Sequence, residues 1–294
     1  MNLKHSAWAC ALFLAALGPG QALAAAPISV THALGTTLIQ PPVQRVVALD
    51  MNEVDFLDQL GVPVAGMPKD FVPPFLQRYK DDAAVADTGA IVQPNLERVH
   101  AAKPDLILIT SLQAPHYGEL SEIAPTVHFD VDYRDSQKRH IEVIKQHLLT
   151  LGQIFAKPAL AQQQVGALDA KVAEAKRITA DRPERALVVL HNNGAFSSFG
   201  VQSRYGFVFT ELGVKPASPT AEAGLHGQPI SSEFIQPPNP DIISVVERTA
   251  VMEHRPLLNA QTLGNPLLRQ TNAWKTGRVV FVDADAWYVM AASP

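Results

Sequence analysis

One short pattern occurs twice in this sequence, once in each half of the chain. Leu96-Glu97-Arg98-Val99 precedes Lys103-Pro104-Asp105 in the first half, and Ser232-Glu233-Phe234-Ile235 precedes Asn239-Pro240-Asp241 in the second. Each glutamate stands seven residues before a Pro-Asp pair, and each pair opens an apolar segment that is typical of a buried strand. The repeat predicts two related lobes that face each other across a cleft, where small ligands prefer to bind. A glutamate at a helix end is ordinary when taken alone, but the matched position favours a shared role.

Short apolar runs on both sides of residue 160 indicate two α/β units. They alternate with helical patterns, as expected for strands of a mostly parallel sheet. The runs lie at 45–49, 105–109 and 126–129 in the first half, and at 185–190, 241–246 and 278–282 in the second.

Between these units lies a segment with helical periodicity. Apolar residues recur at spacings of three and four, which is typical of an amphipathic helix, and Pro158 suits the first turn of a helix. This pattern predicts a long connector helix within residues 137–180, kinked near Lys157-Pro158; two separate helices in one larger domain are the alternative. The apolar positions are Ile141, Ile144, Leu148, Leu151, Phe155, Leu160, Val165, Leu168 and Val172.

The first residues have the order of a secretory signal peptide. Lys4 precedes an apolar stretch from Ala7 to Leu17, and a run of small residues ends at Ala26. We therefore expect a cleaved leader at 1–26 and a periplasmic protein with an N-terminal lobe at 27–136, a connector at 137–180 and a C-terminal lobe at 181–294. The single cysteine, Cys10, lies in the leader, so no disulfide is expected.

Charge and motifs narrow the function further. The formal net charge is −4, which argues against nucleic acid as a partner. The sequence contains no Gly-x-Ser-x-Gly, His-Glu-x-x-His or phosphate-binding glycine loop, so we expect a binding protein rather than an enzyme.

Several segments, in the same order, resemble the periplasmic siderophore-binding proteins of the FecB, FatB and CeuE type, which are relatives of the cobalamin-binding protein BtuF. The resemblance covers nearly all of the chain after the leader. The segments are Arg45-Val46-Val47-Ala48-Leu49-Asp50, the stretch 94–105, Ser203-Arg204-Tyr205-Gly206, the stretch 226–234, Val246-Glu247-Arg248 and the stretch 281–288.

The resemblance implies a fold and a set of partners. The fold is that of a class III periplasmic binding protein, with two Rossmann-like α/β lobes joined by a rigid helix. The protein would be a monomer without an intrinsic cofactor that delivers its ligand to an inner-membrane ABC permease. Glu97 and Glu233 match the glutamates that dock onto arginines of that permease.

The resemblance also implies which residues bind the ligand, a ferric siderophore. Ferric iron prefers oxygen ligands, and a tetradentate chelator leaves two coordination positions open. His226 and Tyr288 match the residues that fill them, while Arg204 and Arg248 match arginines that face an anionic catecholate complex. Taken alone, a loop histidine is usually solvated, Trp287-Tyr288 would usually be core, and exposed arginines are common.

One departure and three alternatives accompany this assignment. Relatives place a third arginine after the strand at 106–109, where this chain has Thr110-Ser111-Leu112-Gln113, so the site would carry one positive charge fewer. Haem and cobalamin also accept axial His or Tyr ligands. A chelator-free metal-binding protein would need three or four converging His, Asp or Glu ligands, and the histidines here are scattered.

Overall fold

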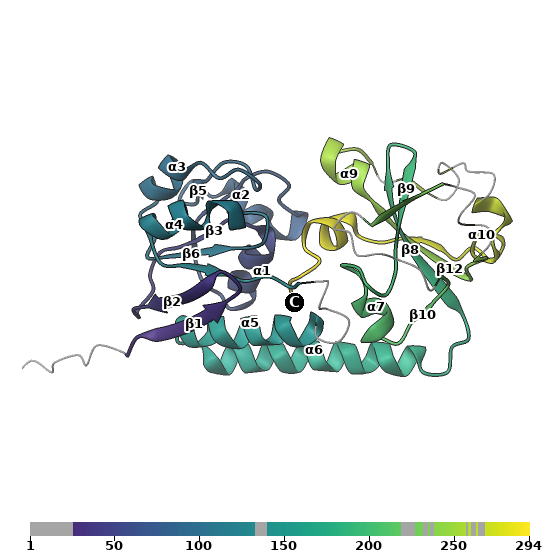
Figure 1. The fold of residues 1–294 in the computed structure, drawn as a ribbon, viewed down its shortest axis with the longest axis horizontal. Coiled ribbons are helices and arrows are strands. Elements are labelled where there is room, and N and C mark those ends of the chain that lie inside the picture. Colours follow the sequence, from purple (N-terminus) through teal and green to yellow (C-terminus); the bar gives the residue numbers. More distant parts are fainter. Residues whose placement is uncertain are drawn as a thin grey trace, which may run out of the picture.

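The computed structural model describes residues 26–132, 140–218, 227–231, 235, 238–256, 258–259, 263 and 268–294. Two α/β lobes lie side by side above a pair of helices (Figure 1). Both α/β lobes predicted from the sequence are present. Within the described residues, no helix is long and apolar enough to cross a membrane.

The N-terminal lobe is built on a parallel sheet of order β5-β4-β3-β6-β7. An antiparallel hairpin of β1 (Ile28–His32) and β2 (Gly35–Ile39) lies beside it. The sheet strands are β3 (Val46–Ala48), β4 (Val64–Met67), β5 (Ala86–Asp87), β6 (Leu106–Ile109) and β7 (Thr126–His128). The α-helices of this lobe are α1 (Met51–Gln59), α2 (Gln77–Asp81), α3 (Leu96–Ala101) and α4 (Tyr117–Ile123).

The C-terminal lobe contains a mixed sheet of order β11-β9-β8-β12-β13, with the short β10 also paired to β8. Strands β8, β12 and β13 are parallel, and β9 and β11 are antiparallel to their neighbours. The strands are β8 (Arg185–Asn192), β9 (Ala195–Phe199), β10 (Lys215–Pro216), β11 (Gln228–Ile230), β12 (Ile242–Glu247) and β13 (Val279–Phe281). The helices include α7 (Phe207–Thr210), α9 (Arg248–Glu253), α10 (Asn272–Lys275) and a π-helical turn at Asp285–Val289.

All six strands predicted from apolar runs are present; five of them are mostly buried, whereas β13 lies at the edge of its sheet with Val280 48% exposed. Strands β3, β6 and β7 occupy the runs of the first half, and β8, β12 and β13 those of the second. All four residues of β6 are buried, which explains why its sequence is apolar throughout rather than alternating.

The Pro-Asp pairs have the same structural role in both lobes. The Asp105 carboxylate accepts a hydrogen bond from the Arg45 backbone N–H at 2.9 Å, and that of Asp241 accepts one from the Arg185 N–H at 3.0 Å. Each aspartate thereby ties the start of its strand to the start of the neighbouring strand. The repeat therefore marks equivalent points of two related lobes.

The connector differs from the single kinked helix expected from the sequence. The chain forms α5 (His140–Ile154), turns back at residues 155–157, and forms α6 (Pro158–Thr179), which lies beside α5 and extends beneath both lobes (Figure 1). The prediction of a kink was wrong because Ala156 adopts a left-handed conformation, with φ of 53°, that ends α5 and reverses the chain.

The C-terminal residues form a second connection between the lobes. Met290 is buried in the core of the N-terminal lobe. The backbone N–H of Ala292 donates to the Asn52 side-chain oxygen at 3.0 Å, and His140 Nε2 donates to the Ala291 carbonyl at 3.0 Å. The π-helical turn that carries Tyr288 is thus held at the junction of the lobes.

Candidate ligand-binding cleft

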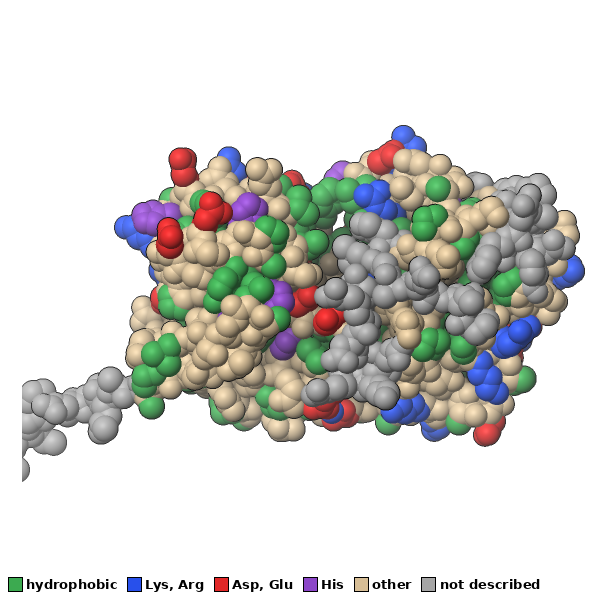
Figure 2. All heavy atoms as spheres, in the orientation of Figure 1, with side chains coloured by type: hydrophobic (Ala, Val, Ile, Leu, Met, Phe, Trp, Pro, Cys, Tyr) green, Lys and Arg blue, Asp and Glu red, His purple; other side chains and the backbone are tan. Residues whose placement is uncertain are grey.

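A cavity of about 410 Å³ lies between the two lobes. Figure 2 shows an opening between them that is bordered in part by hydrophobic side chains. All five strands of the N-terminal sheet contribute residues that follow their carboxyl ends: 50 and 52, 70–71, 90–92, 110–112 and 130–131. Ligands of open parallel α/β sheets bind at this edge, so the fold itself places the cavity.

Two arginines and a tyrosine line the C-terminal side of the cavity. Arg204 Nη2 donates to the Tyr288 carbonyl at 2.9 Å, and Arg248 Nε donates to the Tyr288 hydroxyl oxygen at 2.6 Å. Their guanidinium carbons lie 5.8 and 5.4 Å from the centre of the Tyr288 ring. The phenol is therefore flanked by two cations.

The positive charge of these arginines is available to a ligand. Arg248 Nη1 donates to the amide oxygen of Asn192 at 3.0 Å, so both arginine side chains donate to neutral groups among the described residues. Among the described residues, neither guanidinium forms an ion pair with a carboxylate. Two half-buried cations without a carboxylate partner in the described part of the chain favour an anionic or oxygen-rich ligand.

A buried network holds Arg248 at the carboxyl end of β12. One Glu247 oxygen accepts from the Thr249 backbone N–H at 3.2 Å and caps α9, and the other lies 2.7 Å from His191 Nδ1. His191 Nε2 accepts from the Gly194 N–H at 3.0 Å, so the imidazole proton is on Nδ1 and is donated to Glu247. This network fixes the first residue of α9, which is Arg248.

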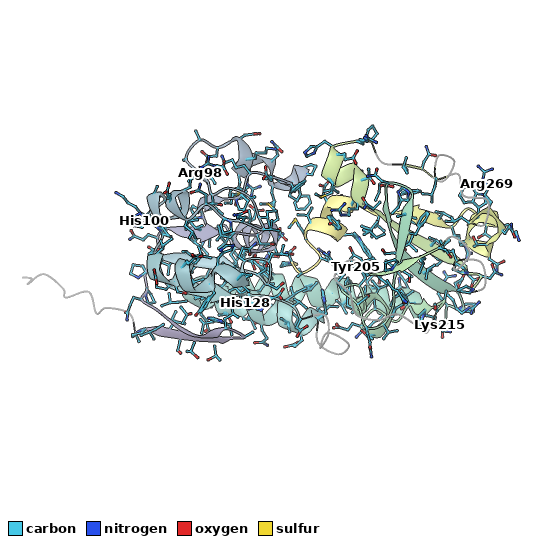
Figure 3. The ribbon with its side chains drawn as sticks, turned by 45° about the horizontal axis from the view of Figure 1, so that its top comes forward. Arg98, His100, His128, Tyr205, Lys215 and Arg269 are labelled. Atoms are coloured by element: carbon cyan, nitrogen blue, oxygen red, sulfur yellow. The ribbon has the colours of Figure 1, made fainter. Side chains whose placement is uncertain are left out.

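Tyr205 packs against Arg204, the other arginine of the cleft. It lies in the C-terminal lobe on the side that faces the cleft (Figure 3). Its side chain is fully buried, its hydroxyl donates to the Trp287 carbonyl at 2.7 Å, and the Arg204 guanidinium lies 5.2 Å from its ring centre. Burial raises the pKa of Tyr205 to about 12, so this phenol keeps its proton and acts as a fixed donor.

The N-terminal side of the cavity begins with Asp50, which caps α1. One of its oxygens accepts from the Asn52 backbone N–H at 2.9 Å and from the Asn52 amide at 2.6 Å, and the other accepts from the Thr110 hydroxyl at 3.3 Å. Burial raises the pKa of Asp50, while the hydrogen bonds from Asn52 and Thr110 oppose this shift.

His140 lines the cavity at the junction of the lobes. Its ring stacks on Phe207 at 4.4 Å. Burial and, to a smaller extent, the nearby charge of Arg204 lower its pKa to about 4, although the hydrogen bond to the Ala291 carbonyl opposes the shift. His140 is therefore neutral near pH 7, with its proton on the nitrogen that faces the Ala291 carbonyl.

Comparisons with known proteins identify the family. The family model for periplasmic binding proteins matches residues 46–286. The chain belongs to the periplasmic binding protein family. It is 62% identical to the ferric-anguibactin-binding protein FatB of Vibrio anguillarum, over 91% of this chain and 83% of FatB, and 35% identical to the petrobactin-binding protein YclQ of Bacillus subtilis, over 89% and 82%. The solved structure of the siderophore-binding protein BauB, bound to a complex of two acinetobactin molecules and ferric iron, matches with a TM-score of 0.88 and 63% identity, over 92% of this chain and 94% of BauB.

In this periplasmic binding protein, three of the four predicted ligand-binding residues converge. Arg204, Arg248 and Tyr288 line one cavity although they are far apart in the sequence. His226, predicted as the second iron ligand, and Glu233, predicted to dock the permease, lie outside the described residues. Glu97 is exposed on α3 and is not among the residues that line the cavity.

At the position where relatives have a third arginine, this chain has the apolar Leu112. Leu112 lines the cavity, and Gln113 is buried, where its side-chain oxygen accepts from the Thr110 N–H at 2.9 Å. Among the lining residues described, the lysines and arginines are Arg204 and Arg248 alone. No group of three or more His, Cys, Asp or Glu suited to holding a metal ion occurs in the described part of the chain.

Sequence reasoning missed most of the N-terminal side of this periplasmic binding protein's cleft. Asp70, Phe71, Asp130 and His140 line the cavity, yet none stood out in the sequence. Their position in the chain was a usable signal. Asp70, Asp130 and Asp50 closely follow the carboxyl ends of β4, β7 and β3, respectively.

Proposed function

We propose that this chain captures a ferric siderophore of the catecholate type in the cleft between its lobes and delivers it to an inner-membrane ABC permease. The observation that carries this proposal is the pair of arginines around Tyr288, which form no ion pair with a carboxylate among the described residues. Catecholate oxygens are anionic, and guanidinium groups bind such oxygens through a planar fork of donors.

The relatives support the same class of ligand. FatB is named for ferric anguibactin, YclQ for petrobactin, and BauB was solved with ferric iron and acinetobactin. The cavity volume of about 410 Å³ falls in the range of small-molecule sites.

We also propose Tyr288 and His226 as protein ligands of the bound iron. The hydroxyl oxygen of Tyr288 accepts a hydrogen bond from Arg248, and the two guanidinium charges complement a phenolate at this position. Iron would arrive with its chelator as cargo, so no resident cofactor is required.

The remaining proposals concern the export of the protein and its docking to the permease. Residues 1–26 would direct export to the periplasm, and the lobes at 27–136 and 181–294 would dock through Glu97 and Glu233. The helix that carries Glu97 begins at a cap formed by Asn95, whose side chain accepts a hydrogen bond from the Arg98 N–H at 2.9 Å. This cap fixes the start of the helix and therefore the backbone position of Glu97 at the surface.

A titration with a ferric bis-catecholate complex tests the proposed function. Tryptophan quenching gives the affinity, and the visible charge-transfer band reports the iron ligands. We expect tight binding by the natural chain and, in Tyr288→Phe, a shifted band with affinity about tenfold weaker, because one oxygen ligand is lost. Tyr79→Phe is the matched control, since the Tyr79 hydroxyl donates to Asp58, away from the cleft.

An absence of binding would contradict the proposal. The same titration would then be repeated with haem, cobalamin and a free divalent metal ion, which have distinct spectra. An unchanged band in Tyr288→Phe together with tight binding would keep siderophore capture and remove Tyr288 from the iron.

A further inference from the structure

The turn between β8 and β9 lies against the start of α9, the helix that begins with Arg248 (Figure 1). Asn193 and Gly194 form this turn with φ of 49° and 85°, which is typical of an Asn-Gly turn in a β-hairpin. The Asn193 backbone N–H donates to the Thr249 hydroxyl at 2.8 Å, and the Asn193 side-chain amide donates to Glu253 at 3.0 Å. These contacts hold the turn and α9 together.

The residues at the ends of β8 and β12 form two successive pairs. His191 lies opposite Glu247 in the parallel register, and their buried side chains are joined at 2.7 Å, while Glu247 also accepts from the Thr249 N–H. The next residues along the chain are Asn192 and Arg248, and Arg248 Nη1 donates to the Asn192 side-chain oxygen at 3.0 Å. The buried pair keeps the strand ends in register and thereby brings the Asn192 amide to the Arg248 guanidinium.

Asn192 offers Arg248 an acceptor that carries no charge. An aspartate has nearly the same shape and could accept the same hydrogen bond, but its carboxylate would neutralise the guanidinium. Both side chains are half-buried, so solvent would screen such an ion pair less than one on the surface. The amide therefore fixes the guanidinium and leaves its positive charge to act on the cavity that Arg248 lines.

The second arginine of the cavity is held in the same way. Arg204 donates to the Tyr288 carbonyl, which is also an uncharged acceptor. Arg248 donates through Nε to the Tyr288 hydroxyl and through Nη1 to Asn192, and neither contact uses its Nη2 group. Among the described residues, both arginines thus combine a fixed position with the absence of a carboxylate partner.

We propose that Asn192 positions Arg248 without neutralising it, and that this neutrality makes the cleft select ferric complexes of net negative charge over those of net positive charge. Asn192 is not among the residues that line the cavity, so it acts through Arg248. This inference rests on the proposed function and specifies the charge of the ligand that the cleft prefers.

The test compares two synthetic ferric complexes of similar size and opposite charge. A ferric bis-catecholate carries a net negative charge, and a ferric bis-hydroxamate carries a net positive charge. Both are titrated, with tryptophan quenching as the signal, into the natural chain, Asn192→Asp and Asn192→Ala. The first variant adds a carboxylate and keeps the acceptor, whereas the second removes the acceptor and adds no charge. Gln163→Glu adds the same charge at an exposed position of α6, outside the cavity lining, and is the matched control.

We expect the natural chain, Gln163→Glu and Asn192→Ala to prefer the bis-catecholate. In Asn192→Asp the ratio of the two affinities should fall by at least about tenfold, because a carboxylate beside Arg248 weakens the binding of an anion and strengthens that of a cation. Urea unfolding should show that Asn192→Asp is about as stable as the natural chain, since the hydrogen bond to Arg248 is kept. A purely structural role of Asn192 would therefore leave the ratio unchanged.

Two results would overturn the inference. One is an unchanged ratio in Asn192→Asp, and the other is an equal fall of the ratio in Gln163→Glu or Asn192→Ala. In either case the bis-catecholate would still bind the natural chain, and the proposed function would stand. If the natural chain bound neither complex, the proposed function would fail together with the inference.

Discussion

His140 lines the cavity, contacts the C-terminal residues at the junction of the lobes, and has a lowered pKa. Its Nε2–H is committed to the Ala291 carbonyl, its ring packs on Phe207, and Arg204 lies near enough to disfavour a second positive charge. The pKa of about 4 in the folded protein lies below the ordinary histidine value of 6.5. The folded state therefore binds fewer protons than the unfolded state between these two values.

The contribution of His140 to the free energy of unfolding should consequently fall as the pH is lowered from 6.5 toward 4. The stability contributed by neutral His140 is complete above pH 6.5 and is lost at about 1.4 kcal/mol per pH unit below it. Burial also lowers the pKa of His147, to about 3, which adds a slope of the same sign. Urea unfolding at several pH values measures the total slope.

The variant His140→Phe isolates one of the two histidines. In this variant, the slope of the free energy of unfolding against pH should decrease by about one proton, whatever the stability at neutral pH. This slope depends on the difference in bound protons between the folded and unfolded states and not on the contacts of the side chain. His100→Phe, at an exposed position of α3, is the control and should leave the slope unchanged. An unchanged slope in His140→Phe would refute the role of this residue.

At the residue scale, the sequence predicted the cationic side of the cleft better than the acidic side. Arg204, Arg248 and Tyr288 lie in segments that resemble a family and were found through it. Asp130 and His140 had no such context, and their surroundings depend on how five strand ends and the C-terminal residues come together. Contacts between residues about 150 positions apart, such as His140 with Ala291, leave no periodic signal in a sequence.

The α5–α6 hairpin shows how a single glycine sets the distance between two elements. A Cβ added at Gly152 would lie 2.4 Å from the Ala161 Cβ, whereas a Cβ at Gly166 would meet nothing within 4 Å. Both glycines are inside helices, where glycine is less favourable than alanine by about 1 kcal/mol. Substitutions at the two positions therefore distinguish the effect of helix propensity from the effect of packing between α5 and α6.

We expect opposite effects from the same substitution at these two sites. Gly166→Ala should raise the free energy of unfolding by about 1 kcal/mol. Gly152→Ala should lower it by about 1–3 kcal/mol, because α5 and α6 must move apart. Urea unfolding measures both, and a stabilising Gly152→Ala would show that the close approach of the helices is not required.

Element prediction succeeded for the apolar strands and failed where the chain reversed. The six predicted strands are apolar runs, and the structure contains them, while β5 and β10 are two residues long and too short for any pattern. The reversal between α5 and α6 rests on a left-handed Ala156, a conformation that the sequence usually signals with glycine or asparagine. Of α6, Ala161 and Val165 are buried, so its apolar stripe is weak beyond them.

At the scale of the whole molecule, two connections restrict the relative motion of the lobes. Helix α6 extends beneath both, and residues 290–292 return to the N-terminal lobe through Met290, Ala291 and Ala292. A hinge needs a few residues that absorb large backbone rotations, and a continuous helix of 22 residues offers few. Recognition by a permease would therefore depend on the surface presented by both lobes at once rather than on a large closure.

The double variant Glu97→Ala with Glu233→Ala tests this separation of docking from ligand capture. Removing both carboxylates should leave the affinity for a ferric bis-catecholate unchanged, because Glu97 lies on α3, away from the cavity lining. Uptake of the complex by proteoliposomes that contain the cognate permease should be lost, since matched charges guide such encounters. The control, Glu119→Ala with Glu122→Ala, removes two exposed carboxylates from α4 of one lobe and should retain uptake. Normal uptake by the Glu97 and Glu233 variant would refute docking through these residues, and weakened ligand binding would show that the two functions share a surface.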